Sequence, residues 1–277
     1  MPKLLLVLIL LISCSDSKNS DSEKNHALKQ ETTVAEFQSI LDAAKVKGGV
    51  LIYDLLGDTY YSNDFEWAKQ GKLPASTFKI ANSIIALETT DIANDSTLFE
   101  WAGEDRNFDV WEQDLPFRQA FRYSCVPCYQ EVARDIGAEK MSHYLDKLEY
   151  RNMDVDTSNI DMFWLVGESR INQFQQIDFL KRFYQSELPI SSRTELIVKS
   201  MMVLDENEEY KLSGKTGWSI NNEVNNGWFV GFIEAQNNTY FFATNVEPTE
   251  DFDMNLFASI RQEVTYNALK QMKVIGE

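Results

Sequence analysis

The segment Pro74-Ala75-Ser76-Thr77-Phe78-Lys79, which runs into an apolar stretch ending near Ala86, indicates how this chain folds and where its chemistry lies. Its pattern predicts a buried helix, and the i, i+3 spacing places Ser76 and Lys79 on one face. The free N–H groups and positive dipole of a first helical turn then lie beside Ser76. A serine hydroxyl becomes nucleophilic when a nearby base removes its proton, and a desolvated lysine is neutral enough to be that base. Taken alone, S-x-x-K also arises by chance, with a serine that only caps a helix and a lysine in solvent.

Two downstream segments complete a set that is hard to obtain by chance. Lys215-Thr216-Gly217 falls on a predicted edge strand. A strand beside the nucleophile supplies a backbone N–H to an oxyanion, Lys215 supplies positive charge, and Gly217 lets a substrate approach the backbone. Between the two motifs lies Tyr123-Ser124-Cys125-Val126, where Ser124 is a candidate to relay a proton to a leaving nitrogen.

The periodicity around these motifs predicts strands at both ends of the domain and helices between them. The expected strands are 49–55, 59–61, 210–215, 227–234 and 239–245, and the expected helices are 34–44, 74–86, 129–136, 140–148, 171–184, 193–202 and 254–272. This order predicts an α/β (α+β) fold in which helices flank one mainly antiparallel sheet and a helical lobe is inserted in the middle. The cleft between the two lobes is the expected place for an active site.

The N-terminus predicts export and a lipid anchor. Lys3 precedes the apolar run Leu4 to Ile12, which is too short to span a bilayer, and Leu11-Ile12-Ser13-Cys14 resembles a bacterial lipobox. We therefore expect a signal peptide at 1–13, lipid on Cys14, a flexible tether over 14–32 and a folded domain over 33–277. The expected location is the bacterial cell envelope, with the membrane contacted only through this anchor. An ordinary signal peptide with a chance cysteine is the alternative.

Composition and charge bound the class of protein. Hydrophobic residues make up 44% of the 277 residues, enough for a substantial core and against an intrinsically disordered chain. The formal charge of -17, without a Lys/Arg stripe, makes nucleic acid a poor partner. A small molecule bound in a local basic pocket is compatible with this charge.

Histidine is too scarce for two common hydrolase mechanisms. The chain has only His26, in the expected tether, and His143, in an expected helix with no nucleophile motif nearby. A Ser-His-Asp triad is therefore disfavoured, and a zinc hydrolase with several histidine ligands is ruled out, so we expect no metal. His143 is interpreted as a surface or packing residue.

Cys125 and Cys128 form a C-x-x-C pair that admits two interpretations. Redox catalysis is disfavoured, because a thioredoxin-like pair follows a strand of a βαβ unit and this pair lies in a helical region. A pair of buried thiols, or a local disulfide in an oxidising envelope, is the better account, and the sequence leaves these two open.

Together these motifs resemble the class D (oxacillinase-type) serine β-lactamases of the penicillin-binding-protein superfamily, over nearly all of the chain after the tether. S-x-x-K with a downstream K-T-G is the superfamily's pair. The family's Ser-x-Val motif is matched by Ser124-Cys125-Val126, and its tryptophan loop by Phe163-Trp164-Leu165. Gly227-Trp228-Phe229 resembles the strand after K-T-G, and Arg261-Gln262 resembles the arginine position that holds the substrate carboxylate.

The resemblance implies hydrolysis of a β-lactam amide and resistance to such antibiotics, with Ser76 as nucleophile. It implies no cofactor except carbon dioxide, which would carboxylate Lys79 in a dry pocket walled by Phe78 and Val126, with Trp164 donating to the carbamate. The oxyanion hole would be formed by the backbone N–H groups of Ser76 and Trp218. The substrate carboxylate would be held by Lys215, Thr216 and Arg261.

One departure and two rival functions accompany the resemblance. Where the family usually has Tyr-Gly-Asn, this chain has Tyr150-Arg151-Asn152, so a changed loop is expected and neither Tyr150 nor Asn152 is assigned a catalytic role. A penicillin-sensing receptor domain shares the acylation chemistry but deacylates slowly, and it needs a membrane helix or output domain that the sequence does not show. A cell-wall transpeptidase is the further alternative, against which Trp164 and Ser-x-Val argue.

Overall fold

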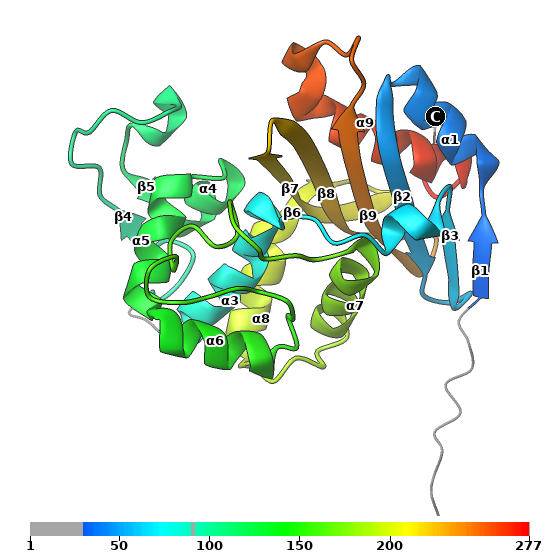
Figure 1. The fold of residues 1–277 in the computed structure, drawn as a ribbon. Helices are drawn as coiled ribbons and strands as arrows, with labels where there is room; N and C mark the ends of the chain where they lie inside the picture. Colours follow the sequence, from blue (N-terminus) through cyan, green and yellow to red (C-terminus); the bar gives the residue numbers. More distant parts are fainter. Residues whose placement is uncertain (1–29, 90–91, 277) are drawn as a thin grey trace, which may run out of the picture.

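The computed structural model describes residues 30–89 and 92–276, which form a large sheet with helices on both faces (Figure 1). The strand order is β1-β3-β2-β9-β8-β7-β6, and every pairing is antiparallel except that of β1 with β3. The strands of this sheet are β1 (Gln30–Thr33), β2 (Val46–Asp54), β3 (Thr59–Ser62), β6 (Val203–Glu206), β7 (Tyr210–Asn221), β8 (Val224–Ala235) and β9 (Asn238–Pro248). A small second sheet pairs β4 (Leu98–Phe99) with β5 (Leu115–Pro116).

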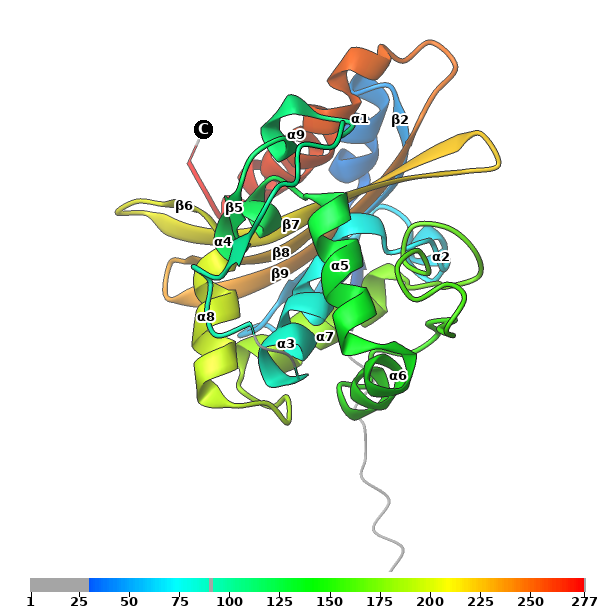
Figure 2. The ribbon, with the colours of Figure 1, turned by 90° about the vertical axis from the view of Figure 1, so that its left-hand side faces the viewer.

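The helices divide between the two faces of the sheet. In Figures 1 and 2, α1 (Ala35–Ala43) and α9 (Phe257–Gln271) cover one face, while α7 (Gln173–Tyr184) and the helical lobe lie on the other. The lobe contains α3 (Lys79–Thr89), α4 (Phe117–Arg122), α5 (Val126–Ile136), α6 (Ala138–Lys147) and α8 (Ser192–Met202). The short helix α2 (Phe65–Ala68) packs on β2, and 3-10 turns occupy Ala75–Phe78, Asp109–Trp111 and Met254–Leu256.

Alternation along the strands separates two hydrophobic cores. In β2, Val50 and Ile52 belong to the core beneath α1 and α9, whereas Leu51 and Tyr53 belong to the larger core shared with the helical lobe. Successive strand side chains point to opposite faces, so a central strand that is covered on both sides is apolar at nearly every position. The run Trp228–Ile233 of β8 is buried throughout for this reason.

The structure confirms the expected antiparallel sheet and inserted helical lobe, with three corrections. Residues 30–32, assigned to the tether, form part of β1. The chain around Ser76 is a 3-10 turn that becomes an α-helix only at Lys79. β7 is not the edge strand, because β6 pairs with its first part, up to Ser213; Lys215–Gly217 lie beyond that pairing and keep one side of the strand unpaired, as an edge strand would.

Within the described ranges, the structure contains no helix of the length and apolarity needed to cross a membrane. Cys14, the expected signal peptide and residues 14–29 of the expected tether, with His26, lie outside the described residues.

Candidate active site

The site is built around the turn that carries Ser76. Lys79 Nζ lies 3.1 Å from Ser76 Oγ, so the two side chains expected to react are in hydrogen-bond contact. Ala75, immediately before the serine, has φ +50°, a left-handed conformation that costs energy for a residue with a Cβ. Its N–H donates to Trp164 O at 2.9 Å, which helps to hold this strained entry to the turn.

Lys79 is enclosed by apolar side chains. Its side chain is fully buried, and burial lowers the pKa of its amine from 10.5 to about 7. The Tyr129 ring centroid lies 5.0 Å from Nζ, and Ser76 Oγ is the hydrogen-bond partner of the amine within the described part of the chain. About half of the amine is therefore neutral at pH 7, whereas an ordinary lysine is almost fully protonated there, and a base or a carboxylation site requires the neutral form.

Strand β7 runs directly against the Ser76 turn. A Cβ on Gly217 would stand 3.1 Å from both Pro74 O and Thr77 Cγ2, a tight contact, so glycine lets the strand approach the turn without displacing it. Lys215 Nζ donates a short hydrogen bond to Ser124 Oγ and a second one, of 3.1 Å, to Thr216 O. Burial, then the charges of Lys79 and Arg261, lower the pKa of Lys215.

Arg261 reaches the same strand from α9. Its Nη1 donates to Gly217 O at 2.5 Å and its Nη2 to Ala258 O at 2.8 Å, while its buried Nε has no partner among the described residues. Burial lowers the pKa of the guanidinium to about 10, still well above neutrality, so it stays charged. Gly227 makes room for it, because a Cβ there would stand 2.6 Å from Arg261 Cδ. A buried cation with an unsatisfied donor beside the cleft suits an anionic ligand.

A cleft of about 620 Å³ opens over these groups. Seven of the residues selected from the sequence line it: Ser76, Ser124, Val126, Thr216, Gly217, Trp218 and Arg261. The sequence did not identify the apolar rim, to which Phe108, Val110, Trp111, Tyr123 and Ile220 contribute. Except for Trp111, which is buried, these side chains are large, apolar and exposed, as at Phe108 (58%) and Ile220 (60%), and exposure is not visible in sequence.

Trp164 lies behind the nucleophile. It is fully buried and stacks on Phe78, with ring centroids 5.5 Å apart. Its indole Nε1 has no hydrogen-bond partner among the residues that the structure describes. A buried donor without a partner is costly, so an acceptor supplied by something other than these side chains is indicated.

Tyr150-Arg151-Asn152, which replaces the family's Tyr-Gly-Asn, supports the fold and does not line the cleft. Positive φ falls on Glu149 and Asn152, so Arg151 needs no glycine-like conformation and instead pairs with Glu149 at the surface. Tyr150 is buried edge-on against Phe78, with centroids 5.7 Å apart. It supports the turn from beneath and does not line the cleft.

Cys125 and Cys128 form a disulfide, which resolves the alternatives left open by the sequence. Both residues are buried, so the pair is not placed to exchange with external thiols. His143 is exposed on α6, as a surface residue should be. In the described ranges, no group of three or more His, Cys, Asp or Glu residues could hold a metal ion.

Known proteins resemble this arrangement closely. The family model for the penicillin-binding-protein transpeptidase domain matches residues 41–270. β-Lactamase OXA-48 of Klebsiella pneumoniae is 39% identical over 232 residues, covering 83% of this chain and 85% of that protein. A class D β-lactamase structure from Sebaldella termitidis superposes with a TM-score of 0.84 at 34% identity, over 90% of this chain and all of that one. The Nostoc class D enzyme YbXI gives 0.82 at 41% identity, over 86% and 99%. The chain therefore belongs to the class D serine β-lactamases, within the penicillin-binding-protein and β-lactamase superfamily.

Proposed function

We propose that this protein hydrolyses the amide bond of β-lactam antibiotics through an acyl-enzyme on Ser76, and so gives resistance to them. One observation carries the proposal: Ser76 Oγ lies 3.1 Å from an amine whose pKa burial lowers to about 7, so that a large share of it is neutral near pH 7. The relatives that share the fold are named β-lactamases, which supports this reaction over slow-release sensing or cell-wall transpeptidation.

The side chains of the cleft supply each step of acylation. Ser76 Oγ attacks the carbonyl carbon as its proton passes to the base at Lys79. The backbone N–H groups of Ser76 and Trp218 stabilise the oxyanion. Each such donor contributes about 3 kcal/mol to the transition state. The C–N bond then breaks, and the nitrogen takes a proton through Ser124, whose hydroxyl contacts Lys215. Water later cleaves the ester and returns a proton to Ser76.

The opposite wall of the cleft would hold the substrate's carboxylate. Thr216 on β7 and Arg261 on α9 line the cleft, and the charged guanidinium matches an anion; Lys215, buried beside Thr216, contributes its amine from behind the lining. Val126 contributes an apolar contact on the other side. Burial is the main cause that lowers the pKa of Lys215, and repulsion by Lys79 and Arg261 lowers it further. A bound substrate carboxylate would offset this repulsion.

We also propose that carbon dioxide carboxylates Lys79. Two features of the residues present fit this group: a neutral buried amine, and the partnerless Nε1 of Trp164 beside Phe78. The carboxylate, once formed, would supply a base both for acylation and for activation of water. Phe78 and Trp164 keep bulk water away from the amine.

The direct test is hydrolysis of a chromogenic cephalosporin by the purified protein. Ser76→Ala should abolish turnover, because the acyl-enzyme then has no oxygen to form on. Ser142→Ala, on α6 away from the cleft, serves as the matched control and should keep full activity. Continued turnover by Ser76→Ala would refute the assignment of the nucleophile.

Mass spectrometry over time separates hydrolase from sensor. After brief exposure to penicillin, a hydrolase shows a transient adduct on Ser76, and a sensor shows one that persists. Expression in a susceptible bacterium should raise the inhibitory penicillin concentration for the wild type and not for Ser76→Ala.

We propose, finally, that Cys14 carries lipid that anchors the protein in the cell envelope. The support is the short apolar run that ends in Leu11-Ile12-Ser13-Cys14. Cys14→Ala should move the protein from the membrane fraction to the soluble one without changing its specific activity. A wild-type protein found only in the soluble fraction would contradict the anchor.

A further inference from the structure

The Cys125–Cys128 disulfide lies directly beside a residue of the reaction. Cys125 follows Ser124 in the chain and is the N-cap of α5, where its Sγ accepts the N–H of Cys128 at 3.2 Å. The disulfide therefore closes the first turn of α5 on itself. Both cysteines are buried and outside the cleft lining, so neither touches the substrate.

Ser124 needs such support because its backbone is strained. Its φ of +54° lies in the left-handed region, which is unfavourable for a residue with a Cβ. Hydrogen bonds from Ser124 N to Phe121 O (3.2 Å) and from Cys125 N to Ala120 O (2.9 Å) hold the peptides on either side. This conformation brings Oγ to Lys215 Nζ. A strained residue persists only where its surroundings over-determine it, and the locked helix start is part of those surroundings.

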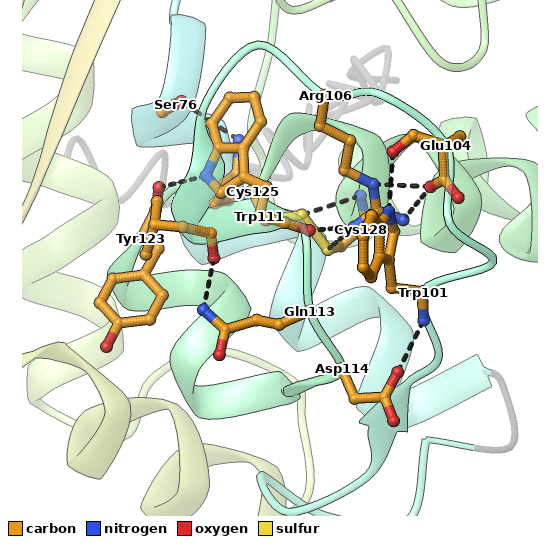
Figure 3. The surroundings of a disulfide bond; sticks show 12 residues. Ser76, Trp101, Glu104, Arg106, Trp111, Gln113, Asp114, Tyr123, Cys125 and Cys128 are labelled. Carbon is orange, nitrogen blue, oxygen red and sulfur yellow. Dashed lines mark hydrogen bonds and ion pairs between the residues drawn. A yellow bond between two sulfur atoms is a disulfide. The ribbon is translucent and has the colours of Figure 1, made fainter.

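The same disulfide lies beside Arg106 and Trp111, from the connection that precedes Ser124 (Figure 3). Arg106 Nη1 lies 4.0 Å from Cys128 Sγ and donates to Trp111 O at 2.8 Å. The indole of Trp111 in turn donates to Tyr123 O at 3.0 Å. Trp111 and Tyr123 both line the cleft and precede Ser124 in the chain. Through Arg106 and Trp111 they connect to the disulfide that follows Ser124, so contacts on both sides of Ser124 lead to this one buried bond.

We propose that the Cys125–Cys128 disulfide is a positioning element for acylation: it holds Ser124 in the conformation that places its hydroxyl between Lys215 and the leaving nitrogen. The inference rests on the proposed hydrolysis. Because Ser124 delivers the proton to the nitrogen, the acylation step depends on the link. Deacylation, in which that C–N bond is already broken, does not.

The test uses Cys125→Ser/Cys128→Ala, which removes the covalent bond and retains an oxygen acceptor at the N-cap. The acylation rate constant, measured by stopped flow or timed mass spectrometry with a slowly turned-over β-lactam, should fall about tenfold, within the loss that a misplaced catalytic group produces. The hydrolysis rate of an acyl-enzyme formed beforehand should stay unchanged. A purely structural role would not separate the two steps.

Ile136→Ala is the matched control, since it removes a buried side chain at the other end of the same helix. It should lower the melting temperature and leave both rate constants unchanged. If Cys125→Ser/Cys128→Ala does not fold, wild-type protein reduced by a phosphine, with two more free thiols counted than before reduction, replaces it. Unchanged acylation without the link, or equal loss in both steps, overturns the inference. A wild type that acylates but never deacylates would instead refute the hydrolysis and leave the acylation comparison intact.

Discussion

Changing the pH between 6 and 8 should titrate Lys79 and control the reaction. Because burial lowers the pKa of this amine from 10.5 to about 7, the ammonium form is disfavoured by about 5 kcal/mol. Such an amine is about 90% neutral at pH 8 and about 10% neutral at pH 6, whereas an amine with pKa 10.5 would be under about 1% neutral at both. Carboxylation requires the neutral amine and releases a proton to solvent, so hydrolysis at constant dissolved carbon dioxide should fall at least about ninefold from pH 8 to pH 6.

The assay measures initial rates with saturating chromogenic cephalosporin, in buffers equilibrated with one carbon dioxide pressure. Added bicarbonate should restore part of the rate at pH 6. Lys140→Met, which removes an exposed amine on α6, should keep the wild-type profile. A flat profile, or a rate that rises as the pH falls, would refute the reasoning, as would an unmodified amine in a high-resolution map at pH 8.

Three further outcomes are expected. Arg261→Ala should raise KM about tenfold or more for β-lactams with a free carboxylate and have little effect on their uncharged esters; equal KM values in wild type and variant would remove Arg261 from the binding site. Trp164→Phe should increase the bicarbonate needed for half-maximal activity, and an unchanged requirement would show that the indole N–H plays no part. Lys79→Met should be inactive yet more stable than wild type in carbon-dioxide-free buffer. Burying the protonated lysine costs its full free energy below the folded pKa of about 7, and this cost disappears as the pH rises to the unfolded pKa near 10.5. The gain in unfolding free energy on replacing the lysine should therefore reach about 5 kcal/mol at pH 6 and shrink towards pH 10. A gain that grew with pH would contradict this.

The reactive centre was predictable from sequence because its parts are local patterns. Ser76 and Lys79 are three residues apart, so their spacing predicts that the two side chains lie together. Lys215 is far away in the chain, and only the resemblance of its K-T-G motif to the superfamily's pair places it beside them. The cleft rim was not predictable, since Phe108 and Trp111 come from a long connection without periodicity. The disulfide was not determined either, because C-x-x-C permits the observed Cα–Cα distance of 5.4 Å without requiring it.

The sheet shows the same division. Strands with continuous apolar runs, such as β2 and β8, are predicted close to their observed positions, because burial on both faces of the sheet imposes that pattern. Gln30–Thr33 was missed as a strand, since Gln-Glu-Thr-Thr carries no apolar signal and is held at an exposed edge by backbone pairing with β3. Which distant strands pair with each other cannot be predicted from the local sequence of either strand.

The pairing of β2 with β9 affects the order of folding during synthesis. Val46 lies opposite Pro248, so a strand made early acquires its neighbour only after about 200 further residues have been added. At ribosomal speeds of about 5–20 residues per second, β2 waits about 10 seconds or longer with one side unpaired. A growing polypeptide that stops short of β9 thus has an open sheet, and premature termination should yield aggregation-prone fragments with no partial activity.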